Sequence, residues 1–88
     1  MNTAATTALF TAYVALENAA EGIYGGEDLT RAYSTSILYF TARGYITRAA
    51  ELVLDLADDL ETAADDTDAD DAAQECVTTA VRDARAAL

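Results

Sequence analysis

The stretch ITRAAELVLDLADDLETAA, residues 46–64, is the clearest amphipathic segment of the chain. Its apolar side chains recur at steps of three and four residues, at Ile46, Ala49, Ala50, Val53, Leu56, Ala57, Leu60 and Ala64. Its other face is polar and mostly acidic, with Thr47, Glu51, Asp55, Asp58 and Thr62. Because an α-helix turns once every 3.6 residues, this spacing predicts a helix with one face in a core and the other in solvent.

Glycines punctuate the rest of the chain, which contains no proline. A first helix is predicted from Thr3 or Thr6 to about Glu21, since the glycine pair at 25–26 ends that region. Asp28 is predicted to cap a second helix, because an aspartate at this position accepts hydrogen bonds from free backbone N–H groups.

Further along, Gly44 is predicted to interrupt or kink the second helix before the amphipathic segment begins. The acidic run at 65–71 is predicted to form a turn, because short polar side chains favour turns, and a last helix follows over about 70–87. The predicted fold class is therefore all-α: a single helical domain over 1–88, built as a small bundle of three to four helices with a central helical hairpin over 37–60.

Alanine dominates the apolar content, with 21 of the 88 residues. An alanine buries little area, so the predicted core depends on the larger apolar side chains. These are Leu9, Phe10, Tyr13, Val14, Leu16, Ile23, Tyr24, Leu29, Tyr33, Ile37, Phe40, Ile46, Val53, Leu56 and Leu60. A core of this size suits a small bundle and gains from a partner surface.

The charged residues are mostly acidic. The chain contains sixteen carboxylates, five arginines and no lysine, which gives a formal net charge of −11. Like charges destabilise a compact state unless salt screens them, and at molar salt the Debye length falls to about 3 Å. We therefore expect a halophile-type acidic protein that works in a salt-rich cytoplasm. The alternative is an acidic mesophilic or phage protein from a GC-rich genome.

The sharpest chemical motif lies in the acidic run, where Asp66, Asp68 and Asp70 match positions 1, 3 and 5 of a calcium-binding loop. Asp71 stands where that loop needs glycine, and Val77 stands where it needs a bidentate glutamate. A solvated acidic turn is therefore predicted instead of a metal site, and the three aspartates remain weak candidates for a loosely bound cation.

Catalytic motifs are missing from the sequence. There is no histidine to act as a base for Cys76, the single cysteine, which is predicted to be a small core residue. The glycine pair at 25–26 is followed by two acids, which oppose a phosphate group. The sequence therefore predicts a protein that is not an enzyme and uses no cofactor.

Residues 1–16 carry no charged side chain, but threonines interrupt the apolar run and no basic segment precedes it. This pattern fits neither a signal peptide nor a membrane span. The expected location is the cytoplasm or a virus particle, without secretion and without a membrane.

Residues 29–48 contain three arginines, three tyrosines and no acid. Leu38 and Tyr39 lie off the apolar stripe of the predicted second helix, which consists of Leu29, Tyr33, Ile37 and Phe40. A helix that is apolar on both sides indicates contact with a second chain. Since tyrosine and arginine anchor protein interfaces, the predicted interface consists of Leu38, Tyr39, Arg43, Tyr45 and Arg31. Nucleic acid is a disfavoured partner, because the remaining acids repel phosphate.

Between Tyr13 and Arg43 the chain resembles the head–tail adaptor, or connector, proteins of tailed viruses. The shared pattern is a first helix ending in Ala-Glu and aliphatic-Tyr, then a second helix with an early alanine and an aromatic-x-x-Arg end. Here the matching residues are Ala20, Glu21, Ile23, Tyr24, Ala32, Phe40 and Arg43. The prolines usual between those helices are missing, and residues 50–88 match no part of the pattern. The resemblance implies a ring-forming structural role in a virion.

These observations predict a non-enzymatic structural protein that forms part of a larger assembly, such as a homo-oligomer, in a halophilic archaeon or its virus. Two alternatives stay open. One is a regulatory protein-binding module of the antitoxin or adaptor kind, and the other is a weak cation-binding protein.

Overall fold

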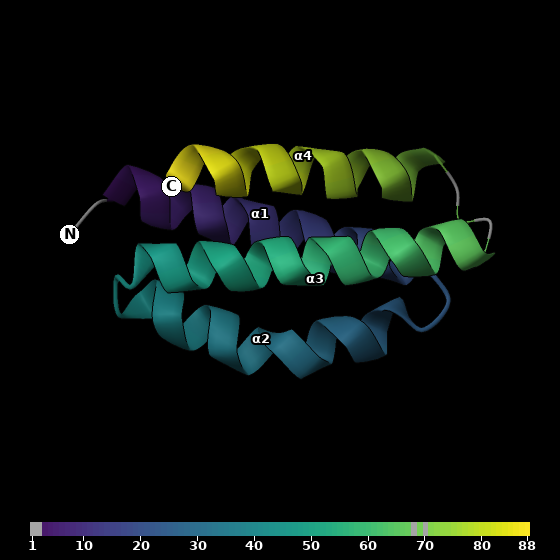
Figure 1. Cartoon of the computed structure of the whole chain (residues 1–88), viewed down its shortest axis with the longest axis horizontal. Coiled ribbons are helices and arrows are strands. Elements are labelled where there is room, and N and C mark those ends of the chain that lie inside the picture. Colours follow the sequence, from purple (N-terminus) through teal and green to yellow (C-terminus); the bar gives the residue numbers. More distant parts are fainter. Residues whose placement is uncertain (1–2, 68, 70) are drawn as a thin grey trace.

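The computed structural model describes residues 3–67, 69 and 71–88. Within this part of the chain the structure is all-α and consists of four helices (Figure 1). They are α1 (Thr3–Glu21), α2 (Gly26–Ala42), α3 (Ile46–Thr67) and α4 (Asp71–Ala87). The predicted small helical bundle is thus confirmed, with principal extents of 39 × 21 × 15 Å.

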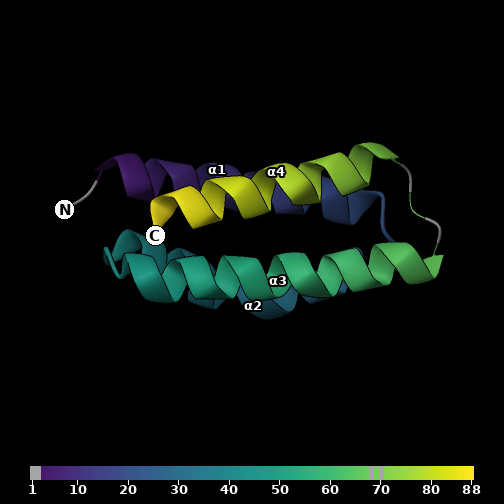
Figure 2. The same ribbon diagram turned by 45° about the horizontal axis from the view of Figure 1, so that its top comes forward.

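The helices run alternately up and down in two layers. Figure 2 shows α1 and α4 in one layer and α2 and α3 in the other, which agrees with the extensive packing of α1 on α4 and of α2 on α3. In addition, α1 and α3 each contact all three other helices. The first and last described residues lie at the same end of the bundle, beside the turn from α2 to α3 (Figure 1).

The predicted central hairpin is α2 and α3, and Gly44 ends α2 instead of kinking it. Gly44 has a positive φ of 79°, a backbone conformation that favours glycine. Its N–H donates to the carbonyl of Thr41 at 3.1 Å, and the N–H of Tyr45 donates to that of Phe40 at 3.0 Å. This pair of bonds is a Schellman motif, which satisfies carbonyls left free at the helix end.

The start of α2 differs from its prediction, because Gly25 and not Asp28 occupies the N-cap position. Gly25 has a φ of 77° and makes no side-chain cap, while Asp28 lies within the first turn beside Glu27. Two acids in a first turn still interact favourably with the positive end of the helix dipole. A Cβ built on Gly26 would lie 2.6 Å from the carbonyl oxygen of Ala20, so only glycine permits this close approach of α1 and α2.

The core face predicted for residues 46–64 is confirmed, since Ile46 is partly buried and the other apolar residues of that stripe are fully buried. Eleven alanines are buried in all, four of them in this stripe, and their small side chains let the helices pack closely. The core prediction is wrong for three residues, because Phe10, Val14 and Tyr24 are exposed. Phe10 and Val14 lie on the side of α1 that no other helix covers, and Tyr24 lies in the turn after it.

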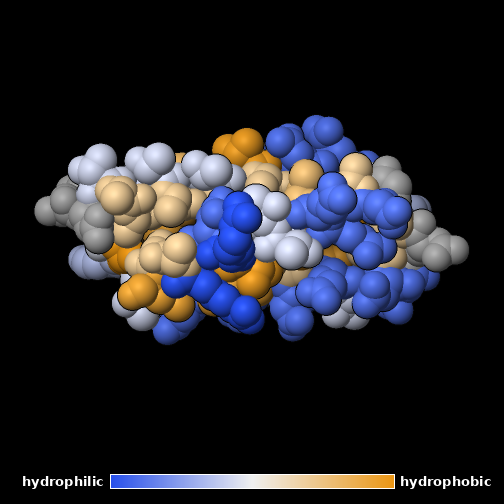
Figure 3. All heavy atoms as spheres, turned by 90° about the horizontal axis from the view of Figure 1, so that it is seen from above, coloured by the Kyte–Doolittle hydropathy of each residue, from blue (hydrophilic) through white to orange (hydrophobic). Residues whose placement is uncertain are grey.

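The turn predicted to begin at residue 65 is also wrong, because α3 continues through Asp65 and Asp66 to Thr67. Hydrophilic residues crowd the half of the molecule where α3 leads to α4, and they reach the middle of the face seen in Figure 3. The other half of that face is mostly apolar or weakly polar. Among the described residues, no helix is both long and apolar enough to cross a membrane.

Candidate interaction surface

An exposed group of apolar and aromatic side chains lies where α2 turns into α3. We define the Tyr39 surface as Leu38, Tyr39, Arg43 and Tyr45. The helical period explains its position, because Ile37 points into the core and its two successors therefore point outward. The side chain of Tyr39 is 49% exposed and that of Tyr45 is 56% exposed, which leaves two large rings open to solvent.

Ring contacts hold this surface in place. The Tyr39 and Phe40 rings meet edge to face with centroids 5.3 Å apart, and the Phe40 and Tyr45 rings are 6.0 Å apart. The guanidinium carbon of Arg43 lies 4.9 Å from the Tyr39 centroid, within the range of a cation–π contact. These contacts constrain the Tyr39 and Tyr45 rings and the Arg43 guanidinium, so fewer side-chain conformations have to be lost on binding.

Arg31 and Arg43, which are predicted to lie in the same interface, differ in their ion pairs. Arg43 has no ion pair with any residue that the structure describes, so its charge is free for a partner. Arg31, which was predicted to share the interface, lies twelve residues earlier on α2, about 18 Å away at 1.5 Å per residue. Its Nη1 is instead 2.9 Å from Oδ1 of Asp28. The structure thus joins Tyr39 to Arg43 directly and to Tyr45 through Phe40. Leu38 is exposed next to Tyr39 in the chain, and Arg31 lies apart.

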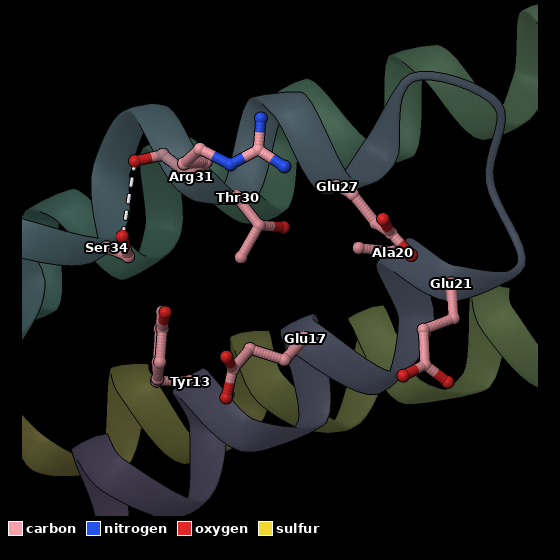
Figure 4. A pocket seen from close by; sticks show the side chains of 8 residues that line it. All are labelled: Tyr13, Glu17, Ala20, Glu21, Glu27, Thr30, Arg31 and Ser34. Atoms are coloured by element: carbon pink, nitrogen blue, oxygen red, sulfur yellow. Dashed lines mark hydrogen bonds between the residues drawn. The ribbon is translucent and has the colours of Figure 1, made fainter.

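A groove of about 300 Å³ lies between α1 and α2, at some distance from the Tyr39 surface. It is lined by Tyr13, Glu17, Ala20, Glu21, Glu27, Thr30, Arg31 and Ser34 (Figure 4). Tyr13 projects from α1 and Thr30 from α2 toward each other across the gap. The pKa of Tyr13 is raised, first by burial and second by the negative charge of Glu17. The three glutamates make this groove unfavourable for anions.

Thr30 is the unusual residue of the groove, because its Oγ1 is buried and makes no hydrogen bond to the part of the chain that the structure describes. Other helical threonines, Thr41, Thr62 and Thr78, donate to the carbonyl four residues earlier, at 2.7 to 3.1 Å. No pattern in the sequence indicates this groove, since its residues come from two helices whose alignment depends on how closely Gly26 approaches α1.

The predicted cation candidates fall largely outside what the structure describes. Asp66 is exposed on α3, whereas Asp68 and Asp70 are not among the described residues. Within the described ranges, no three acidic or cysteine side chains lie close enough together to hold a metal ion. Cys76 is half-buried against the core cluster.

Comparisons of the chain with protein-family models, with curated proteins and with solved structures found no match. The functional argument therefore rests on the residues and geometry of this chain.

Proposed function

We propose that this chain is a non-enzymatic structural protein that joins a larger assembly through the Tyr39 surface. The observation that carries the proposal is a cluster of exposed aromatic rings beside Arg43, which has no ion pair with any residue that the structure describes. Buried tyrosine and arginine side chains contribute more binding energy than most interface residues. An exposed cluster of this kind in an acidic protein marks a place where water is displaced by a partner.

The proposed setting is a salt-rich one, in a halophilic archaeon or a virus that infects it, in the cytoplasm or within the virus particle. The acids of α3 are exposed to solvent, as Glu51, Asp55 and Asp58 illustrate, except Asp59, which is partly buried. Molar salt screens their mutual repulsion, whereas dilute buffer does not. The most specific form of this proposal is that the chain is a head–tail adaptor of a virus particle.

Sedimentation velocity in about 2 M KCl, where the Debye length is below about 3 Å, tests the proposal. The unchanged protein is expected to sediment as an oligomer. The double variant Leu38→Ser, Tyr39→Ser is expected to sediment as a monomer with unchanged helical circular dichroism, because both side chains are exposed and little of the core is lost.

The matched control is Val14→Ser, which replaces an apolar side chain of similar exposure, 50%, on α1. This variant is expected to assemble like the unchanged protein. Normal assembly of the double variant, or its unfolding, would contradict the proposed interface. A monomeric unchanged protein would favour the regulatory module, which binds a different protein.

A further inference from the structure

The charges of the bundle divide along its long axis. One end, which we name the basic end, is formed by residues 3–12, 34–54 and 79–88, where α1 begins, α2 turns into α3 and α4 finishes (Figure 1). It holds four of the five arginines but only two carboxylates, Glu51 and Asp83. The antiparallel order of the helices creates this grouping, because segments far apart in the sequence meet at one end.

The opposite end, which we name the acidic end, is formed by residues 13–33, 55–67 and 71–78. In these ranges there are twelve carboxylates and one arginine, Arg31, which is already paired with Asp28. The molecule therefore has two ends of opposite sign, although its formal net charge is −11.

Exposed large apolar side chains lie at both ends of the bundle. Phe10, Leu88 and the Tyr39 surface belong to the basic end, and Val14 belongs to the acidic end. The acidic end presents Tyr24, which is 87% exposed in the turn between α1 and α2. Its nearest charged neighbours in the chain are Glu21 and Glu27. The acidic end thus presents an exposed ring among acids, and the basic end presents exposed rings beside Arg43, which has no ion pair with a described residue.

We propose that copies of this chain associate head to tail, with the acidic α1–α2 turn of one copy docked through Tyr24 on the Tyr39 surface of the next. The alternative pairings bring like charges together, acid against acid or arginine against arginine, and like-charge contacts are disfavoured. Head-to-tail docking gives Arg43 a carboxylate partner and covers the exposed rings. A contact of this kind joins two different surfaces, so it extends to a ring or an open chain.

Salt screens both the repulsion between copies and the attraction between Arg43 and a carboxylate, but it weakens the long-range repulsion more. Repulsion between two bodies of charge −11 acts over many ångströms and is screened at molar salt, where the Debye length is about 3 Å. A direct arginine–carboxylate contact acts at about that distance, and the apolar contact between rings is not weakened by salt. Head-to-tail assembly is therefore expected to need salt.

This inference rests on the proposed function, and mixing two variants tests it separately. The basic-end variant carries Tyr39→Ser and Arg43→Glu, and the acidic-end variant carries Tyr24→Ser and Glu27→Arg. Each variant alone is expected to sediment as a monomer in about 2 M KCl, since one of its two contact surfaces is disabled. An equimolar mixture is expected to form a heterodimer and nothing larger, because only one pair of intact ends remains.

Several results would overturn the head-to-tail contact. If the acidic-end variant alone assembles like the unchanged protein, the contact joins two basic ends, and the proposed function survives while this inference fails. A mixture that stays monomeric also contradicts the inference. If the unchanged protein is monomeric, self-assembly itself fails. The single substitutions Tyr24→Ser and Arg43→Glu repeat the mixing test with the least change to the fold, and the Val14→Ser control is expected to assemble normally.

Discussion

The hydroxyl of Tyr33 on α2 donates a 2.6 Å hydrogen bond to Oδ2 of Asp59 on α3. This bond joins the two helices of the central hairpin at a partly buried position. It raises the pKa of Tyr33 to about 12, since it requires the protonated hydroxyl; burial and the negative charges of Asp59, Asp55 and Asp58 act in the same direction.

The Tyr33 bond predicts a loss of stability at alkaline pH. The folded state holds the hydroxyl proton more tightly than the unfolded state, whose tyrosine pKa is about 10. Its stabilising contribution is therefore complete below about pH 10 and is lost as the pH rises toward 12. Tyr33→Phe is expected to lower the free energy of unfolding at pH 7 by about 1 kcal/mol and to lose less stability between pH 10 and 12.

Urea denaturation at constant KCl over this pH range measures the difference. Tyr45→Phe serves as the control, because that ring is exposed, and it is expected to follow the unchanged protein. Parallel pH profiles for Tyr33→Phe and the unchanged protein would mean that the bond to Asp59 does not form in solution.

The junction of α1 and α2 predicts a contrast between two adjacent glycines. Gly26→Ala places a Cβ 2.6 Å from the carbonyl oxygen and 2.9 Å from the Cα of Ala20, so backbone must move. Overpacking of this kind costs about 1–3 kcal/mol. A Cβ at Gly25 meets no described atom within 4 Å, and asparagine tolerates the positive φ, so Gly25→Asn is expected to cost about 1 kcal/mol or less. Equal denaturation midpoints for the two variants would show that α1 and α2 lie further apart.

The acidic composition of residues 51–71 predicts that salt stabilises the fold. Ten acids and no basic residue lie between Glu51 and Asp71, and screening of their repulsion favours the compact state. The melting temperature, followed by circular dichroism, is expected to rise steeply from dilute buffer to molar KCl. A variant with Asp55, Asp58, Asp65 and Asp66 changed to asparagine is expected to melt with a weaker salt dependence. Identical melting curves of the unchanged protein in dilute buffer and molar KCl would contradict the halophile proposal.

The acidic run predicts solvation without specific calcium binding. Since Asp71 and Val77 replace the glycine and glutamate that a calcium loop requires, Asp66→Asn with Asp68→Asn is expected to leave fold and assembly unchanged in molar KCl. Calorimetric titration with calcium is expected to give no saturable heat. Micromolar binding that persists in molar KCl and disappears in the double variant would instead indicate a calcium-dependent switch.

The sequence by itself determined the helices and the fold class. The spacing of apolar residues at 46–64 is a local property, and it specifies both a helix and the face that it buries. The end of the second helix at Gly44 is a local property too, since the positive φ there requires no distant contact. Leu38 and Tyr39 were found to be outside the core stripe for the same reason: their angular position on α2 follows from Ile37 and Phe40 alone.

Only the tertiary structure decided what covers each helix face and which distant residues meet. Phe10 and Val14 lie close to the apolar stripe of α1 in sequence, yet they are exposed because no helix packs on that side. Tyr33 reaches Asp59 only because α2 and α3 are antiparallel in a fixed alignment. The division into a basic and an acidic end likewise arises from the antiparallel order of four helices, which brings together charges that are far apart in the chain.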